Sequence, residues 1–281
     1  MIPKIIHYCW FSGEPFDEKT KMCIETWKEK CPDYEIRECN AENFDMEIND
    51  FVKEAYKAKK WAFVADYARL YLLYKYGGVY MDGDVELVKN IDCFLEAPAF
   101  IGQERKGWIS AGIIGSEAGN DCIKTFLDYY EGKHFINEDG TYNQITNVQI
   151  ITHNLFESYG FLLTGDRQKL GNLLDIYPVD YFSPKDSITE KINCTDNTYA
   201  IHHFNNGWKD GDGNIIKRRM ETLSKILNPS LALFIAELIS LLKPKKGNWN
   251  KLCGKYRTIK LTMSKKRILK LRQKLIKELY K

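Results

Sequence analysis

Two aspartates separated by one glycine, Asp82-Gly83-Asp84, are the residues of this chain whose spacing most directly suggests chemistry. Carboxylates this close repel each other unless a cation lies between or beside them. Their hard oxygen ligands suit Mg²⁺ or Mn²⁺ better than zinc. Gly83 adds no side chain, so the backbone can approach a ligand closely. Because a nucleotide diphosphate supplies further oxygens to such an ion, the pair predicts a site for a metal-bound diphosphate.

A second charged pair, Asp66 and Arg69, precedes the aspartates on a predicted helix. Apolar and aromatic residues recur every three or four positions from Trp61 to Tyr76, which is the helical period. Residues three apart share a helix face, so Asp66 and Arg69 are expected to lie together. The glycine pair that follows, 77–78, ends the helix because glycine adopts a left-handed cap without a Cβ penalty.

The elements around these residues alternate between strands and helices. A short buried strand, 79–81, leads directly into the aspartates. Further strands are expected at 5–9, 34–39, 99–102, 109–115 and 199–203, and helices at 18–30, 50–59, 120–130 and 143–159. This rhythm predicts an α/β sheet flanked by helices, with a nucleotide at the edge where its strands end.

The charged residues form Asp-x-x-Arg and then Gly-Gly-x-Tyr-x-Asp-x-Asp, and residues 2–11 read Ile-Pro-Lys-Ile-Ile-His-Tyr-Cys-Trp-Phe. Both stretches resemble glycosyltransferase family 32, which includes bacterial capsular and lipopolysaccharide sugar transferases, fungal mannosyltransferases and, more distantly, clostridial glucosylating toxins. The resemblance covers residues 1–115 well and the rest loosely. It implies a GT-A-like, Rossmann-like mixed sheet that binds a nucleotide sugar, and sugar transfer with retention of anomeric configuration.

The resemblance also implies roles for individual residues. Asp84 would coordinate the metal, Mn²⁺ or Mg²⁺, together with the donor diphosphate, and Asp82 would contact the donor ribose or sugar and reach the metal through water. Asp66 and Arg69 would bind the donor sugar, with Arg69 offsetting charge on the departing phosphate. Trp10 would stack on or border the base, although an ordinary buried aromatic residue explains it too. A UDP-sugar is preferred over a GDP-sugar as donor.

A later strand from Tyr199 ends in His202 and His203 and is followed by Trp208 and Lys209. This run is similar to the C-terminal segment of many retaining GT-A transferases, in which a histidine is the last protein ligand to the metal and neighbouring groups face the diphosphate. Imidazole is an adequate ligand for Mn²⁺. Because successive strand residues point to opposite faces, only one histidine can readily reach the metal, and His202 is preferred. Two capped or solvent-facing histidines are the alternative.

The acceptor side is less defined. The strand 109–115 resembles the family's segment near the sugar and acceptor. Its small residues Ser110, Ala111 and Gly112 would let a sugar approach, but a tight crossing of strands would also require small residues there. Residues 147–152 read Asn-Val-Gln-Ile-Ile-Thr where the family often has Gly-Pro-x-x-x-Thr. Glu104 and Asp66 are carboxylates that could serve as nucleophile. A front-face substitution, in which the departing phosphate takes the acceptor proton, requires neither.

Composition fits one enzyme domain and an appendage. With 281 residues, of which 44% are hydrophobic, the chain can bury one large core. Its eight cysteines form no Cys-x-x-Cys pair, so a zinc site is not expected and a reducing, cytosolic compartment fits best. The chain begins almost at once with a strand, without the basic and apolar segments of a secretory signal.

Charge divides the chain into two parts. Residues 209–281 hold 20 Lys and Arg against 5 Asp and Glu, whereas residues 1–208 are acidic overall. The apolar run 229–242 is too short for a bilayer, which takes roughly 20 residues, and 265–281 is basic and amphipathic. We therefore predict a catalytic domain at 1–228 and a basic helical tail at 229–281 that lies on an anionic membrane surface. A helical cap on the domain is the alternative; nucleic acid is disfavoured because the tail has few aromatic residues.

These observations together predict a metal-dependent retaining glycosyltransferase, peripheral on the inner face of the cytoplasmic membrane. Its acceptor would be a lipid-linked oligosaccharide in capsular, exo- or lipopolysaccharide synthesis. One alternative is a non-catalytic nucleotide-sugar-binding or scaffold protein recruited to the membrane. A phosphatase of the haloacid-dehalogenase type also places Asp-x-Asp after a strand, with the first aspartate as nucleophile. That alternative explains neither Asp66 nor Arg69, and no convincing later acidic pair follows.

Overall fold

A computed structural model describes residues 1–187 and 189–205. Nine strands are described, namely β1 (Ile5–Cys9), β2 (Glu35–Cys39), β3 (Gly78–Met81), β4 (Val85–Leu87), β5 (Ala99–Arg105), β6 (Trp108–Ser116), β7 (Gln168–Leu170), β8 (Leu174–Tyr177) and β9 (Ala200–His202). The α-helices of this part are α1 (Glu18–Lys30), α2 (Asp50–Lys57), α3 (Trp61–Tyr76), α4 (Asp121–Asp128), α5 (Asn147–Ser158) and α6 (Val179–Phe182). The predicted mixed α/β architecture is confirmed.

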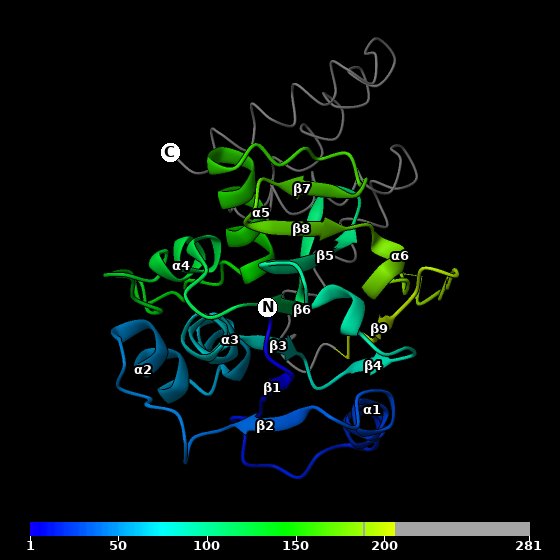
Figure 1. Cartoon of the computed structure of the whole chain (residues 1–281). Helices are drawn as coiled ribbons and strands as arrows, with labels where there is room; N and C mark the ends of the chain where they lie inside the picture. The colour runs from blue at the N-terminus through cyan, green and yellow to red at the C-terminus, as the bar shows by residue number, and fades with distance from the viewer. Residues whose placement is uncertain (188, 206–281) are drawn as a thin grey trace. The chain divides into compact units, whose positions relative to one another are not determined.

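Seven strands form the central sheet in the order β2-β1-β3-β6-β5-β8-β7 (Figure 1). The strands β2, β1 and β3 run parallel, and β6 is antiparallel to both of its neighbours, β3 and β5. A separate two-stranded sheet pairs β4 with β9. Because β1, β2 and β3 share a direction, the loops that follow them emerge at one edge of the sheet, where open α/β sheets bind ligands.

Helices cover both faces of the sheet. On one face α3 contacts β1, β3 and β6, while α2 and α4 pack against α3 and α5 packs against β6 (Figure 1). On the other face α1 packs against β4, and α6 contacts β5 and β9. The core on this second face is rich in aromatic side chains, including the fully buried Trp27, Phe100 and Phe182. Trp27 Nε1 donates a hydrogen bond to the Val85 carbonyl at 2.6 Å, so α1 fixes β4 beside the aspartates.

Local signals explain where the helices begin and end. The Asp17 side chain accepts a hydrogen bond from the Thr20 backbone N–H and begins α1, and the Asn49 side chain caps α2 in the same way. Gly77 ends α3 with a φ of 66° and a ψ of −169°, an extended positive-φ conformation open essentially only to glycine and not the left-handed cap expected. No helix in the described ranges is both long and apolar enough to cross a bilayer. Trp208, Lys209 and the predicted tail, 229–281, lie outside the described residues.

Candidate functional site

Asp82, Asp84 and His202 meet at the edge of the sheet, with one ligand atom from each within 4.8 Å of the others. His202 Nε2 lies 3.3 Å from Asp84 Oδ1 and 3.7 Å from Asp82 Oδ2. The aspartates follow β3, and His202 is brought to them because β9 pairs with β4 in the register Val85↔His202. Two carboxylates and one imidazole form a donor set that fits a hard or borderline divalent cation such as Mn²⁺.

Electrostatics couple His202 to Asp84. Burial lowers the pKa of His202, but the adjacent Asp84 carboxylate outweighs that effect and holds the pKa above its usual 6.5. Burial raises the pKa of Asp84, yet His202 and the Asn205 backbone N–H, which donates to Oδ2 at 2.7 Å, hold it well below its usual range. Asp84 is therefore ionised over the whole physiological range, and His202 must lose its proton before it can bind a cation.

The His202 ring rests on Gly112 of β6. A Cβ at Gly112 would lie 2.6 Å from His202 Nδ1, so only glycine leaves room for the ring. Nδ1 is buried and has no hydrogen-bond partner among the described residues. His203 points elsewhere: its Nε2 is 2.7 Å from Glu86 Oε2 and the residue is not part of the cluster. Of the two predicted histidine ligands, the structure brings only His202 to the aspartates.

Arg69 lies beneath the aspartates and is only 5% exposed. Its Nη1 is 3.1 Å from Asp82 Oδ1 and donates to the Ala111 carbonyl, and its Nη2 is 3.1 Å from Asp66 Oδ1. The guanidinium also lies over the Tyr80 ring, whose hydroxyl donates to Asp82 at 2.8 Å. Asp66 and Arg69 thus share a helix face as predicted. In this structure the buried Arg69 guanidinium lies between the carboxylates of Asp66 and Asp82 and forms an ion pair with each.

Asp66 is held by a residue that sequence reasoning missed. The backbone N–H of Asn147, the first residue of α5, donates to Asp66 Oδ2 at 3.2 Å, and its side chain donates to the Asp66 carbonyl at 2.7 Å. Asn147 is itself fixed by the Tyr130 hydroxyl at 2.7 Å. Burial raises the pKa of Asp66 to about 6, against the opposing pull of Arg69 and the Asn147 N–H. The departure from the family signature at 147 was the one sequence signal that could have drawn attention to it.

Three other residues named from the sequence, Ser110, Glu104 and Gly83, lie around the cluster of Asp82, Asp84 and His202 without belonging to it. Ser110 is fully buried in β6 and its hydroxyl accepts from the Gly112 N–H at 3.2 Å, so it supports the strand beneath His202. Glu104, at the end of β5, is close enough to contribute to the raised pKa of His202. A Cβ at Gly83 would lie 3.3 Å from a Thr20 methyl group and 3.9 Å from Trp10 Cζ3, so the glycine also lets the aspartate loop pack against α1.

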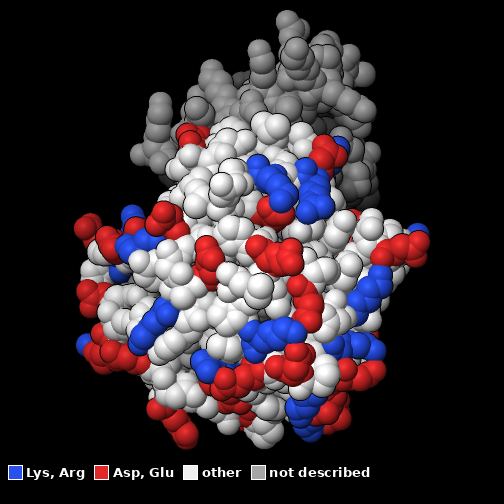
Figure 2. All heavy atoms as spheres, viewed as in Figure 1, with Lys and Arg blue, Asp and Glu red and all other residues white. Residues whose placement is uncertain are grey.

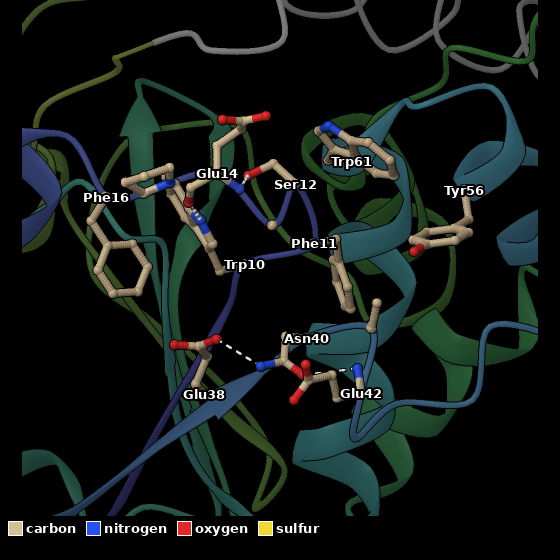
Figure 3. Close-up of a pocket in the computed structure, with 13 residues that line it drawn as sticks. Trp10, Phe11, Ser12, Glu14, Phe16, Glu38, Asn40, Glu42, Tyr56 and Trp61 are labelled. Atoms are coloured by element: carbon tan, nitrogen blue, oxygen red, sulfur yellow. Dashed lines mark hydrogen bonds between the residues drawn. The ribbon is translucent and has the colours of Figure 1, made fainter.

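A cavity of about 400 Å³ opens next to Trp10, between the loops that follow β1 and β2 and the start of α3 (Figure 3). Aromatic and acidic side chains line it, namely Trp10, Phe11, Phe16, Tyr56, Trp61, Glu14, Glu38 and Glu42. Since Trp10 borders both this cavity and Gly83, the cavity adjoins the aspartate loop. Figure 2, viewed as in Figure 1, shows basic and acidic side chains interspersed over the described part of the face that it draws.

A known protein family matches the part of the chain that contains the aspartates at this edge of the sheet. Residues 17–104, about a third of the chain, match the family described as glycosyltransferase sugar-binding region containing DXD motif. The match includes Asp66, Arg69 and the Asp82-Gly83-Asp84 run, and His202 lies beyond it. The chain therefore contains a DXD-type glycosyltransferase region and is a distant relative of glycosyltransferases.

Curated relatives from fungi share part of the chain. It is 32% identical over 134 residues to inositol phosphoceramide mannosyltransferase 3 of Schizosaccharomyces pombe. The aligned region covers 43% of this chain and 35% of the relative. It is 30% identical over 131 residues to mannosyl phosphorylinositol ceramide synthase SUR1 of Saccharomyces cerevisiae. This aligned region covers 41% of this chain and 31% of the relative. The chain thus spans about a third of the length of these two relatives.

Among solved structures, the chain is similar to the PaToxG glycosyltransferase, with a TM-score of 0.43 and 20% identity over 57% of this chain and 70% of that one. It is also similar to a glycosyltransferase involved in glycosylation of the major capsid of PBCV-1, with a TM-score of 0.34 and 14% identity over 62% of this chain and 81% of that one.

Proposed function

We propose that the protein is a metal-dependent, retaining glycosyltransferase that uses a nucleotide-diphosphate sugar. The observation that carries the proposal is the convergence of Asp82, Asp84 and His202 at the edge of the sheet, two of them within the matched DXD region. A bound divalent cation, Mn²⁺ or Mg²⁺, would supply charge for the diphosphate leaving group. Asp84 and His202 are the proposed protein ligands, with Asp82 at the ribose or sugar.

The residues below the metal ligands have a positioning role in this proposal. Arg69 forms ion pairs with both Asp66 and Asp82 and keeps the two carboxylates in fixed positions, which reduces the reorganisation needed when a donor binds. Asp66 has one carboxylate oxygen toward Arg69 and the other toward Asn147, and it is the proposed contact for hydroxyl groups of the donor sugar. Trp208 and Lys209, predicted to face the diphosphate, belong to the proposal on sequence grounds alone.

The first test is nucleotide release from a panel of UDP- and GDP-sugars with Mn²⁺, with and without EDTA. We expect release from one donor that EDTA abolishes and that Asp84→Asn reduces at least about a hundredfold, because the main metal ligand loses its charge. Asp33→Asn is the matched control: Asp33 is an exposed partner of Lys4 just before β2, at the opposite edge of the sheet. Metal-independent release, or full activity in Asp84→Asn, would contradict the proposal.

The acceptor and location complete the proposal. A lipid-linked oligosaccharide of capsular, exo- or lipopolysaccharide synthesis is the proposed acceptor, and the names of the fungal relatives, which contain ceramide, support a lipid component. The basic tail, 229–281, would hold the domain, 1–228, on the inner face of the cytoplasmic membrane. Flotation of the full chain with vesicles tests this: we expect binding to anionic vesicles that fails with neutral lipid and weakens in high salt. Equal binding to both lipids would argue against it.

A further inference from the structure

The cavity beside Trp10 has one wall that is built for a flat, apolar ligand. The Trp10 ring packs edge-on against Phe16 with centroids 4.9 Å apart, and its Nε1 donates to the Glu14 carbonyl at 2.6 Å. These contacts hold the indole in one orientation at the cavity wall (Figure 3). An aromatic face of this kind stacks any nucleobase, because every base has a π-face, so stacking alone does not select one base.

Glu38, at the end of β2, is the polar group that can select. Its Oε2 accepts from the Tyr8 hydroxyl at 2.8 Å and its Oε1 accepts from the Asn40 side chain at 2.8 Å. The Tyr8 ring contacts Phe16, so the carboxylate is tied to the same aromatic wall as Trp10. An ionised carboxylate has about four acceptor positions, and these two hydrogen bonds leave the others available while fixing its orientation.

A carboxylate at the base edge distinguishes between guanine and uracil. Glu14, Glu38 and Glu42 line it, and the described residues around it include no lysine or arginine. Guanine presents two adjacent N–H donors on its Watson–Crick edge, which match the two oxygens of a carboxylate. Uracil presents a single N–H between two carbonyl oxygens, and those oxygens would face the negative charge. A carboxylate that meets the Watson–Crick edge therefore favours guanine and disfavours uracil.

We infer that Glu38 reads the base of the donor and that the site selects a guanine nucleotide over a uracil nucleotide. The inference rests on the proposed function, because a diphosphate bound at Asp84 brings its nucleoside to the cavity that adjoins the aspartate loop. Trp10 stacks the base, and the Glu38 carboxylate accepts from N1–H and the exocyclic amine. This inference replaces the UDP-sugar preference predicted from the family resemblance.

Titration calorimetry of the full chain with GDP and with UDP, both in saturating Mn²⁺, tests the inference. We expect GDP to bind at least about tenfold more tightly than UDP, since one bidentate hydrogen-bonded pair discriminates between bases by about that factor or more. Glu38→Gln should weaken GDP binding about tenfold or more and leave UDP binding unchanged or stronger. Retained UDP binding then also shows that the variant is folded.

Glu42→Gln is the matched control, because it removes the same charge from an exposed position of the same cavity. We expect it to preserve the ratio of GDP to UDP affinity. Tighter binding of UDP than GDP by the wild type, or an unchanged ratio in Glu38→Gln, would overturn the inference while leaving the proposed transferase intact. Binding of neither nucleotide in Mn²⁺ would overturn the proposed function and the inference with it.

Discussion

Asp66 shows at the scale of one residue how a site can work against stability. It is 8% exposed, and burial raises its pKa to about 6 although Arg69 and Asn147 favour the ionised form. An acid whose folded pKa lies above its unfolded value stabilises the fold only when protonated, so this contribution is lost as pH rises from about 4 to 6. At neutral pH the ionised Asp66 lowers the free energy of unfolding, which is the cost expected of a residue kept for function rather than for stability.

The neutral isostere Asp66→Asn should separate the two effects. We expect its free energy of unfolding at pH 8 to equal or exceed that of the wild type, by up to about 2–3 kcal/mol, while sugar transfer is lost. The advantage should disappear near pH 3, below the ordinary pKa of 3.8, where Asp66 is mostly protonated in both the folded and the unfolded state. Urea denaturation at the two pH values measures this. A variant that is markedly less stable at pH 8 would mean that the ion pair with Arg69 outweighs desolvation.

His202 predicts a second pH effect, on metal binding. Its Nε2 must be unprotonated to bind a cation, and Asp84 holds its pKa above 6.5. The apparent affinity for Mn²⁺ should therefore rise with pH, by up to about tenfold per unit below that pKa, and level off above it. In His202→Asn the affinity should be weaker and this part of the pH profile flat. The same slope in the variant would assign the titration to another group.

At the scale of elements, the site depends on how closely β9 approaches β6. Gly112 is the contact point, because a Cβ there would lie 2.6 Å from the His202 ring. Ring displacement by Gly112→Ala should weaken Mn²⁺ binding about 10- to 100-fold, the range seen when support for a metal ligand is removed. Mn²⁺ titration of the folded variant measures it.

Gly102→Ala provides the control for this prediction. A Cβ at Gly102 would lie 2.7 Å from a Phe182 ring carbon, so it introduces a comparable clash between β5 and α6 in the core. We expect this variant to be less stable but to keep its affinity for Mn²⁺. Unchanged affinity in Gly112→Ala, or an equal loss in both variants, would show that the glycine does not act through His202.

At the scale of the whole described region, a metal at this site would link two separate sheets. Asp82 and Asp84 follow a strand of the central sheet, whereas His202 ends a strand of the small one. A ligand that binds only the folded state stabilises it, by about 2.7 kcal/mol at a free concentration 100-fold above its Kd. We expect Mn²⁺ to raise the melting temperature of the wild type and of Asp33→Asn, but not of Asp84→Asn. An equal shift in all three would indicate binding elsewhere.

The elements of the fold, and the charged residues that they carry, follow from local sequence patterns. The helices predicted at 18–30 and 61–76 match α1 and α3, because helical periodicity, the Asp17 cap and the glycine at 77 act between near neighbours in the chain. The same local logic placed Asp82 and Asp84 at the end of a buried strand. The division into domain and tail at 228 stays a prediction, since the tail lies outside the described residues.

Which residues surround the aspartates depends on contacts between elements that are far apart in the chain. The choice of His202 over His203 follows from the register of β4 with β9, and the support from Gly112 and Asn147 follows from packing between elements far apart in sequence. No local pattern encodes those contacts, because pairing register and close approach depend on how the whole core packs. For the same reason the carboxylates around the cavity beside Trp10 form one surface only because β1 and β2 pair side by side: Glu14 lies on the loop after β1, Glu38 near the end of β2, and Glu42 on the loop after β2.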